Sequence, residues 1–79
     1  MRNIGETLKR SRIQAGITQK ELAEAMDLIS SQMVSNWERN LCLPPVKKLR
    51  VLRHQLGMPK QKLKTIMLDA YSQKIEPYL

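Results

Sequence analysis

A short polar run, residues 30–40 (SSQMVSNWERN), holds the side chains of this chain that are best suited to specific hydrogen bonding. On a helix, with about 100° between successive residues, two hydroxyls, two amides and a guanidinium fall on one face, without an acid among them. These groups come from Ser31, Gln32, Ser35, Asn36 and Arg39. Asn and Gln can pair bidentately with adenine, Arg with guanine, and Ser with either base. The run therefore predicts a helix that reads base edges in the major groove of DNA.

The opposite face of this helix predicts burial and an ion pair. Val34 and Trp37 lie there, and Glu38 stands at the border beside Val34. An acid at that border needs a partner, and Arg12 is a base on the inward, otherwise apolar stripe of an earlier helix. We expect a buried or half-buried ion pair between Arg12 and Glu38. In the alternative, Arg12 snorkels to the surface and Glu38 is solvated.

Few other groups could do chemistry, and they argue against an enzyme. The one histidine, His54, has no carboxylate at helical spacing and is expected to be an exposed surface residue. His54 and the single cysteine, Cys42, fall short of the four ligands of a structural zinc site. No glycine-rich phosphate loop is present. The sequence thus predicts no catalysis, metal, cofactor or small-molecule ligand, and Cys42 is expected to be a partly buried hydrophobe in a reducing compartment.

The basic charge is concentrated in one part of the chain. The net charge is +7 for 79 residues. Residues 39–68 contain no acidic residue and eight basic ones: Arg39, Lys47, Lys48, Arg50, Arg53, Lys60, Lys62 and Lys64. Polyanions are the expected partners. The alternatives are a merely solvated basic face and an anionic membrane surface, the latter disfavoured because no helix pairs these bases with an exposed aromatic face. No apolar run could cross a bilayer and residues 1–3 do not lead into a signal peptide, so we expect a cytoplasmic protein.

Helix signals without strand signals predict an all-α fold, with one domain over residues 1–79. Gly and Pro divide the chain into five helix-sized pieces. The first begins at an N-cap, Asn3, and ends at Gly16. Its inward stripe is expected to be Ile4, Leu8, Arg12 and Ala15. The second opens with a capping box over residues 18–21, and the third runs from Ser30 to about Arg39.

Prolines set the remaining two helices. Pro44 and Pro45 are expected to open a fourth helix, which ends at Gly57. Pro59 opens the fifth, which we expect to continue as far as Pro77. The inward residues of these two helices are expected to be Val46, Leu49, Leu52, Leu56, Leu63, Ile66, Met67, Ala70 and Tyr71.

Three stretches of the chain resemble a known family. They are LKRSRIQAGITQKELAEAM at residues 8–26, VSNWERN at residues 34–40 and, after the two prolines, LRVLRHQLG at residues 49–57. Over about residues 4–57 the chain resembles the lambdoid phage repressor and Cro-like (Xre-type) helix-turn-helix proteins. The resemblance implies a compact five-helix fold. In it the second and third helices, residues 18–39, form the DNA-binding unit, and the third helix lies in the major groove.

The resemblance also implies roles for single residues. The base contacts would be Ser31, Gln32, Ser35 and Asn36. The phosphate contacts would be Thr18, Gln19, Arg39 and Asn40. Apart from the resemblance, the basic charge predicts that Lys47 neutralises a further phosphate. The pair of Arg12 and Glu38 has a counterpart in this family. Three departures stand out: the turn over residues 27–30 is one residue longer than usual, Asn40 stands where glycine is common, and Met33 stands where a small or polar residue is common. Met33 is expected to close the rim of the core, and contact with a thymine methyl is the alternative.

These observations favour a sequence-specific regulator of transcription that binds double-stranded DNA, expected to be a repressor in the bacterial cytosol or nucleoid, or encoded by a phage. Because a monomer of this size reads few base pairs, we expect a homodimer on half-sites about 34 to 36 Å apart. The end of the fifth helix could supply the dimer contact, unless its apolar residues pack into the monomer's own core. These residues are Leu68, Tyr71, Ile75, Tyr78 and Leu79. The alternative function is an antitoxin or a protein-interaction module with the same fold.

Overall fold

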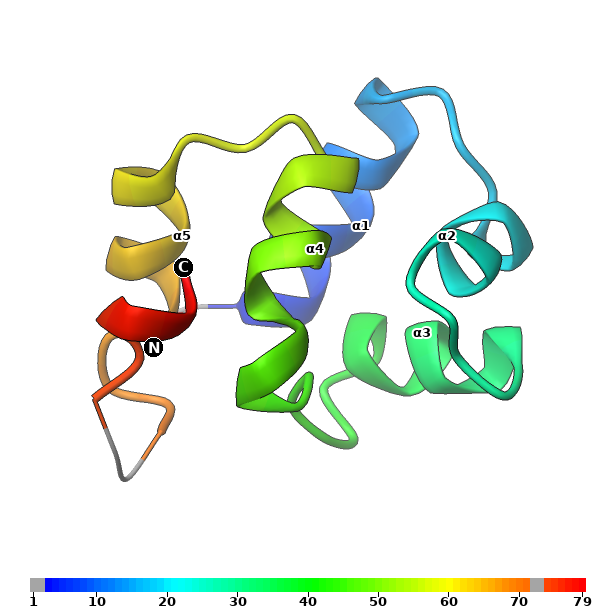
Figure 1. Cartoon of the computed structure of the whole chain (residues 1–79). Coiled ribbons are helices and arrows are strands. Elements are labelled where there is room, and N and C mark those ends of the chain that lie inside the picture. Colours follow the sequence, from blue (N-terminus) through cyan, green and yellow to red (C-terminus); the bar gives the residue numbers. More distant parts are fainter. Residues whose placement is uncertain (1–2, 72–73) are drawn as a thin grey trace.

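The computed structural model describes residues 3–71 and 74–79. Over these residues the chain forms helices joined by turns, without a strand. The elements are α1 (Ile4–Gln14), α2 (Gln19–Ala25), α3 (Ser31–Glu38), the 3-10 helix η1 (Val46–Lys48), α4 (Leu49–Gln55), α5 (Lys60–Met67) and the 3-10 helix η2 (Glu76–Tyr78). In Figure 1, α2 and α3 lie together at one side, α4 stands in front of α1, and α5 lies at the other side with the C-terminal segment. The predicted all-α, five-helix fold is confirmed.

Two helix starts use the capping residues that the sequence predicts. The Asn3 side chain accepts a hydrogen bond from the backbone N–H of Glu6 at the start of α1. Thr18 and Glu21 form a capping box at the start of α2, in which each side chain accepts from the backbone N–H of the other residue. These bonds satisfy N–H groups that the first turn of a helix leaves without an intrahelical partner.

Four helices end on a residue with a left-handed backbone conformation. These residues are Gly16 (φ 75°), Asp27 (φ 57°), Asn40 (φ 61°) and Gly57 (φ 61°). In each case the N–H of this residue donates to the carbonyl three residues back, and the next N–H donates to the carbonyl five residues back, which is the Schellman pattern. Asn and Asp tolerate this conformation better than other residues with a Cβ. The turn between α2 and α3 therefore closes without a glycine, on Asp27.

The core draws on all five α-helices and on the C-terminal segment. Its buried members are Leu8, Leu22, Ala23, Met26, Val34, Trp37, Leu49, Leu52, Leu56, Met58, Leu63, Met67, Ile75 and Leu79. Helix α1 crosses the end of α3 at Gly5, where a Cβ would overlap the carbonyl oxygens of Trp37 and Glu38. The predicted inward position of Ala15 is wrong, because α1 ends at Gln14 and Ala15 is exposed at its C-cap.

The fifth helix is shorter than the sequence predicts. It was expected to reach Pro77, but α5 ends at Met67, and of the remaining span residues 72–73 lie outside the described residues. The chain then returns to the core, where Ile75 and Leu79 are buried. Arg50 Nη2 donates to the carbonyl of Pro77 over 2.9 Å, and a second arginine of α4 binds the carbonyl of Leu79. Burial of this segment stabilises more than an exposed helical continuation would.

Two smaller predictions also need correction. The segment after Pro45 begins as a 3-10 turn, and the regular helix α4 starts only at Leu49. Cys42 is exposed, not partly buried, because the loop that carries it lies at the surface. Among the described helices none is long and apolar enough to span a membrane.

Candidate nucleic-acid interface

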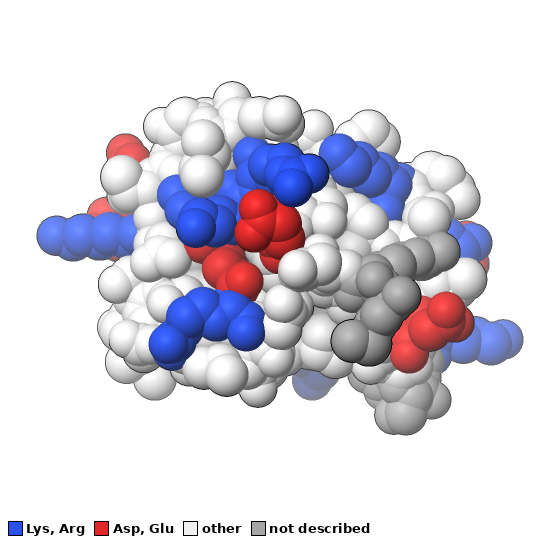
Figure 2. Space-filling model, turned by 180° about the vertical axis from the view of Figure 1, so that it is seen from behind, with Lys and Arg blue, Asp and Glu red and all other residues white. Residues whose placement is uncertain are grey.

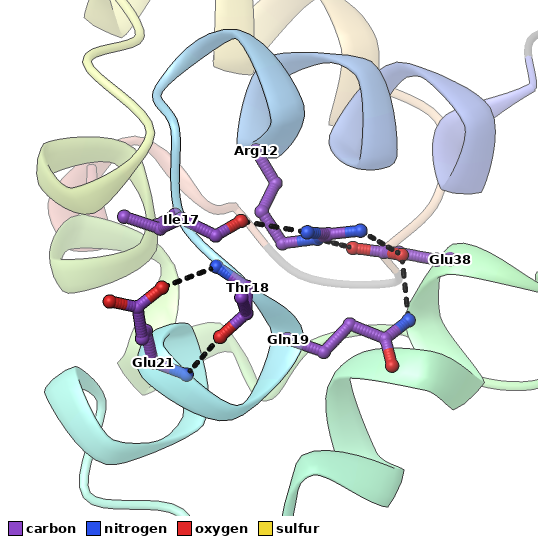
Figure 3. A network of polar contacts seen from close by, with 6 residues as sticks. All are labelled: Arg12, Ile17, Thr18, Gln19, Glu21 and Glu38. Carbon is purple, nitrogen blue, oxygen red and sulfur yellow. Dashed lines mark hydrogen bonds and ion pairs between the residues drawn. The ribbon is translucent and has the colours of Figure 1, made fainter.

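A buried ion pair holds the inner side of α3 against α1 (Figure 3). Arg12 Nε lies 2.6 Å from Glu38 Oε2, and Arg12 Nη2 donates to Glu38 Oε1 over 3.3 Å. The side chains are 11% and 4% exposed. The remaining guanidinium nitrogen, Nη1, donates to the carbonyl of Ile17 over 2.7 Å, so the charge of Arg12 also fixes the loop before α2. Both predicted members of the pair therefore lie together and are buried.

Gln19 joins α2 to the same pair. Its Nε2 donates to Glu38 Oε1 over 2.9 Å, and the side chain is half-buried (Figure 3). The carboxylate of Glu38 thus accepts bonds from α1 and from α2 while belonging to α3. Within the described residues every buried side-chain nitrogen and oxygen has a hydrogen-bond partner. The sequence placed Gln19 at the surface and missed this inner role, since an amide at the start of a helix fits either place.

The outer side of α3 carries a row of three hydrogen-bonded polar side chains. Asn36 Oδ1 accepts from Gln32 Nε2 over 3.0 Å and from Arg39 Nη2 over 3.2 Å. Both bonds are exposed to solvent, whereas the opposite side of the helix buries Val34 and Trp37. The predicted base contacts of the outer face are therefore brought together on one helix, with Ser31 and Ser35 half-buried beside them.

Residues 8–63 match a family model described as helix-turn-helix. The chain belongs to this helix-turn-helix family. It is of the lambda-repressor-like, Xre type, as its sequence motifs indicate, and the family is one of DNA-binding regulators. No curated protein and no solved structure matches the chain.

Three of the predicted phosphate contacts, Thr18, Arg39 and Lys47, are exposed at the surface. Thr18 is exposed at the start of α2, where its hydroxyl accepts the N–H of Glu21 over 3.0 Å. Arg39 and Lys47 are exposed, Arg39 as the C-cap of α3 and Lys47 in η1. These three residues lie at the surface, and their phosphate contacts stay predictions.

Asn40, like Gln19, is a predicted phosphate contact whose side chain is hydrogen-bonded within the protein. Its Oδ1 accepts the backbone N–H of Gly5 over 2.8 Å, and its Nδ2 donates to Asn3 Oδ1 over 3.0 Å. The side chain therefore completes the cap of α1 and ties this helix to the residue that follows α3. The Asn40 side chain therefore has a structural role beside the helix-turn-helix unit, and its phosphate contact stays a prediction.

Basic side chains lie along η1 and α4, the elements that follow the helix-turn-helix unit in the chain. Lys48 Nζ donates to the carbonyl of Met26 over 3.1 Å, which places a positive charge at the C-terminal end of α2. Lys47, Arg50 and His54 line a shallow hollow next to Tyr78. On the opposite face of the molecule, acidic and basic side chains lie next to one another and much of the surface is uncharged (Figure 2).

Proposed function

We propose that the protein is a sequence-specific transcriptional repressor that binds double-stranded DNA in the bacterial cytosol, with residues 1–79 as one domain and residues 18–39 as its DNA-binding unit. The observation that carries this proposal is the outer row of α3, where Gln32, Asn36 and Arg39 are joined by hydrogen bonds on an exposed face. Helix α3 would lie in the major groove with this row towards the base edges.

The row suits base reading because its bonds can be exchanged for bonds to DNA. Asn36 Oδ1 already accepts two hydrogen bonds, and the amino group of an adenine could take the place of one donor while Asn36 Nδ2 donates to N7. Gln32 would then be free for a neighbouring base, and Arg39 for a guanine or a phosphate. Ser31 and Ser35, with one hydroxyl each, would complete the reading surface.

Phosphate contacts would supply most of the affinity. Thr18, Arg39 and Lys47 are exposed around α3 and would each meet the backbone, so binding should weaken steeply with salt. Gln19 and Asn40, whose side-chain amides are bound within the protein, would act through the positions of α2 and α3.

The experiment is selection from random duplex DNA, followed by a salt titration on the selected sequence. Asn36→Ala should relax the sequence preference and lose about 1 to 3 kcal/mol of discrimination at one position. Lys47→Ala should weaken binding to all sequences alike and reduce the slope of affinity against salt by about one. Selection that yields no preferred sequence, or two variants with identical effects, would overturn the proposal.

A homodimer would provide the second half-site that one α3 cannot reach. Leu68, which is 58% exposed at the C-cap of α5, would supply the dimer contact, whereas Ile75 and Leu79 are buried in the chain's own core. We expect light scattering to detect a dimer at tens of micromolar and Leu68→Glu to disrupt it. A monomer that also binds DNA without cooperativity would remove the dimer from the proposal.

A further inference from the structure

The turn between α2 and α3 holds an isoleucine that has almost no contact with the rest of the chain. Ile29 is 98% exposed, whereas the next most exposed large hydrophobic residue, Leu41, is 64% exposed. Full burial of such a side chain would contribute about 1.5 to 3 kcal/mol, and Ile29 contributes none of this to the fold. The fold of the free protein therefore gives no reason for an apolar residue at this position.

The turn itself is built by the neighbours of Ile29. Asp27 takes the left-handed conformation, and the N–H of Leu28 donates to the carbonyl of Ala23 over 2.9 Å. Leu28 is half-buried and packs against the core. Ser30 is the N-cap of α3, and its carbonyl accepts from the N–H of Met33. The hydrogen bonds and the packing of this turn therefore come from the neighbours of Ile29 and not from its side chain.

Ile29 lies close to the N-terminal end of α3, the helix that carries the outer row. It precedes the first residue of α3, Ser31, by two positions, and Ser30 between them is extended (φ −156°, ψ 162°). Figure 1 shows the turn at the outer end of α3, away from α4 and α5. In helix-turn-helix proteins the N-terminal residues of the recognition helix contact the base edges. With α3 in the major groove as proposed, a side chain two positions before the helix would lie near the base edges.

We propose that Ile29 determines specificity by packing its side chain against the C5 methyl group of a thymine in the major groove. This inference rests on the proposed function. The thymine methyl is the apolar group among the donors and acceptors that the base pairs display there. Every predicted base contact on α3 is polar, so Ile29 adds an apolar contact that those residues do not supply. It also gives the extra residue of the longer turn a role in recognition.

The test removes single methyl groups from the DNA. Each thymine of the selected duplex is replaced in turn by deoxyuridine, which lacks only that methyl, and affinities are measured for the full chain. The wild type should lose about fourfold in affinity at one thymine, which is the cost of one buried methyl group. Ile29→Ala should weaken binding to the thymine duplex by a similar or larger factor and bind the two duplexes equally.

Two controls keep this outcome distinct from other failures. Ile13→Ala changes another isoleucine, 57% exposed on α1, and should leave both affinities unchanged. Ile29→Ala should unfold at the same temperature as the wild type, since the Ile29 side chain is 98% exposed. If Ile29→Ala keeps the wild-type ratio of thymine to deoxyuridine affinity at every position, this inference is wrong even where Asn36→Ala relaxes specificity. If selection yields no preferred sequence, the proposed function fails as well.

Discussion

Helix α3 takes part in two clusters that have nearly the same composition and opposite surroundings. On its inner side Glu38 accepts hydrogen bonds from an arginine and a glutamine, Arg12 and Gln19. On its outer side Asn36 accepts from another arginine and another glutamine, Arg39 and Gln32. The inner cluster is buried and its acceptor is charged, whereas the outer cluster is exposed and its acceptor is neutral.

Burial decides what each cluster does. Water cannot replace the partners of Glu38, so the inner bonds lock α1, α2 and α3 into one arrangement. Water, or a base edge, can replace the partners of Asn36 at little cost, because an exposed bond contributes little to stability. The inner cluster therefore serves the fold, and the outer cluster keeps its donors and acceptors for a ligand.

The largest expected effect comes from removing one partner of the inner pair. Arg12→Ala should lower the free energy of unfolding by about 3 to 5 kcal/mol, because it leaves the Glu38 carboxylate buried without its main partner. Urea denaturation measures the loss. Arg10→Ala is the matched control, since Arg10 pairs with Glu6 over 3.6 Å at the surface and should cost less than about 0.5 kcal/mol. A loss below about 1 kcal/mol for Arg12→Ala would show that the inner pair behaves like an exposed one.

The next largest loss of stability is expected where α1 and α3 are pushed apart by a substitution that changes no charged residue. Gly5→Ala should destabilise by about 1 to 3 kcal/mol, because its Cβ would meet the carbonyls of Trp37 and Glu38, which are backbone and cannot move aside. At an exposed helical position the same change would stabilise by about 1 kcal/mol. Thermal unfolding of Gly5→Ala measures the sign of the change in stability. A loss would show that α1 and α3 need the close approach at Gly5, and a gain would contradict it.

A neutral, half-buried hydrogen bond provides an intermediate case. Tyr71 donates its hydroxyl proton to the carbonyl of Pro44 over 2.7 Å, and burial raises the pKa of Tyr71 to about 12. Tyr71→Phe should cost about 1 kcal/mol at neutral pH. The folded pKa lies above the unfolded value of about 10, so this stabilisation is complete below pH 10 and declines as pH rises towards 12. The difference between the wild-type and Tyr71→Phe unfolding curves should shrink over that range; a constant difference would contradict the assignment.

Local signals in the sequence account for most of the fold. Helix starts and ends at Asn3, Gly16 and Thr18 follow from short-range backbone chemistry and were correctly predicted. The inner pair was accessible because a base on an apolar stripe and an acid beside a buried face are both anomalous. Arg12 and Glu38 each need one partner of opposite charge, and each is the partner that the other needs.

Longer-range choices were not accessible from the sequence. Asn40 forms hydrogen bonds with Gly5 and Asn3, which lie more than 30 positions away in the chain. The residues next to Asn40 in the sequence do not indicate these partners. The predicted fifth helix is too long because Pro77 marks only the last point at which a helix can end. It gives no sign that the helix ends earlier, at Met67. Ile75 and Leu79 have helical spacing, but in the structure they flank the short 3-10 helix η2 and both are buried.

The smallest expected effect comes from giving the outer cluster the charge of the inner one. Asn36→Asp would place a carboxylate beside Arg39, three residues on, at the surface. Such a pair on a helix contributes about 0.2 to 0.5 kcal/mol, so the free energy of unfolding should hardly change. DNA binding should fall sharply, because the new charge would face phosphates and can no longer donate to a base. The reciprocal variant, Glu38→Gln, should destabilise the protein far more than Asn36→Asp changes it. Equal effects of the two variants in urea denaturation would mean that burial does not separate the clusters.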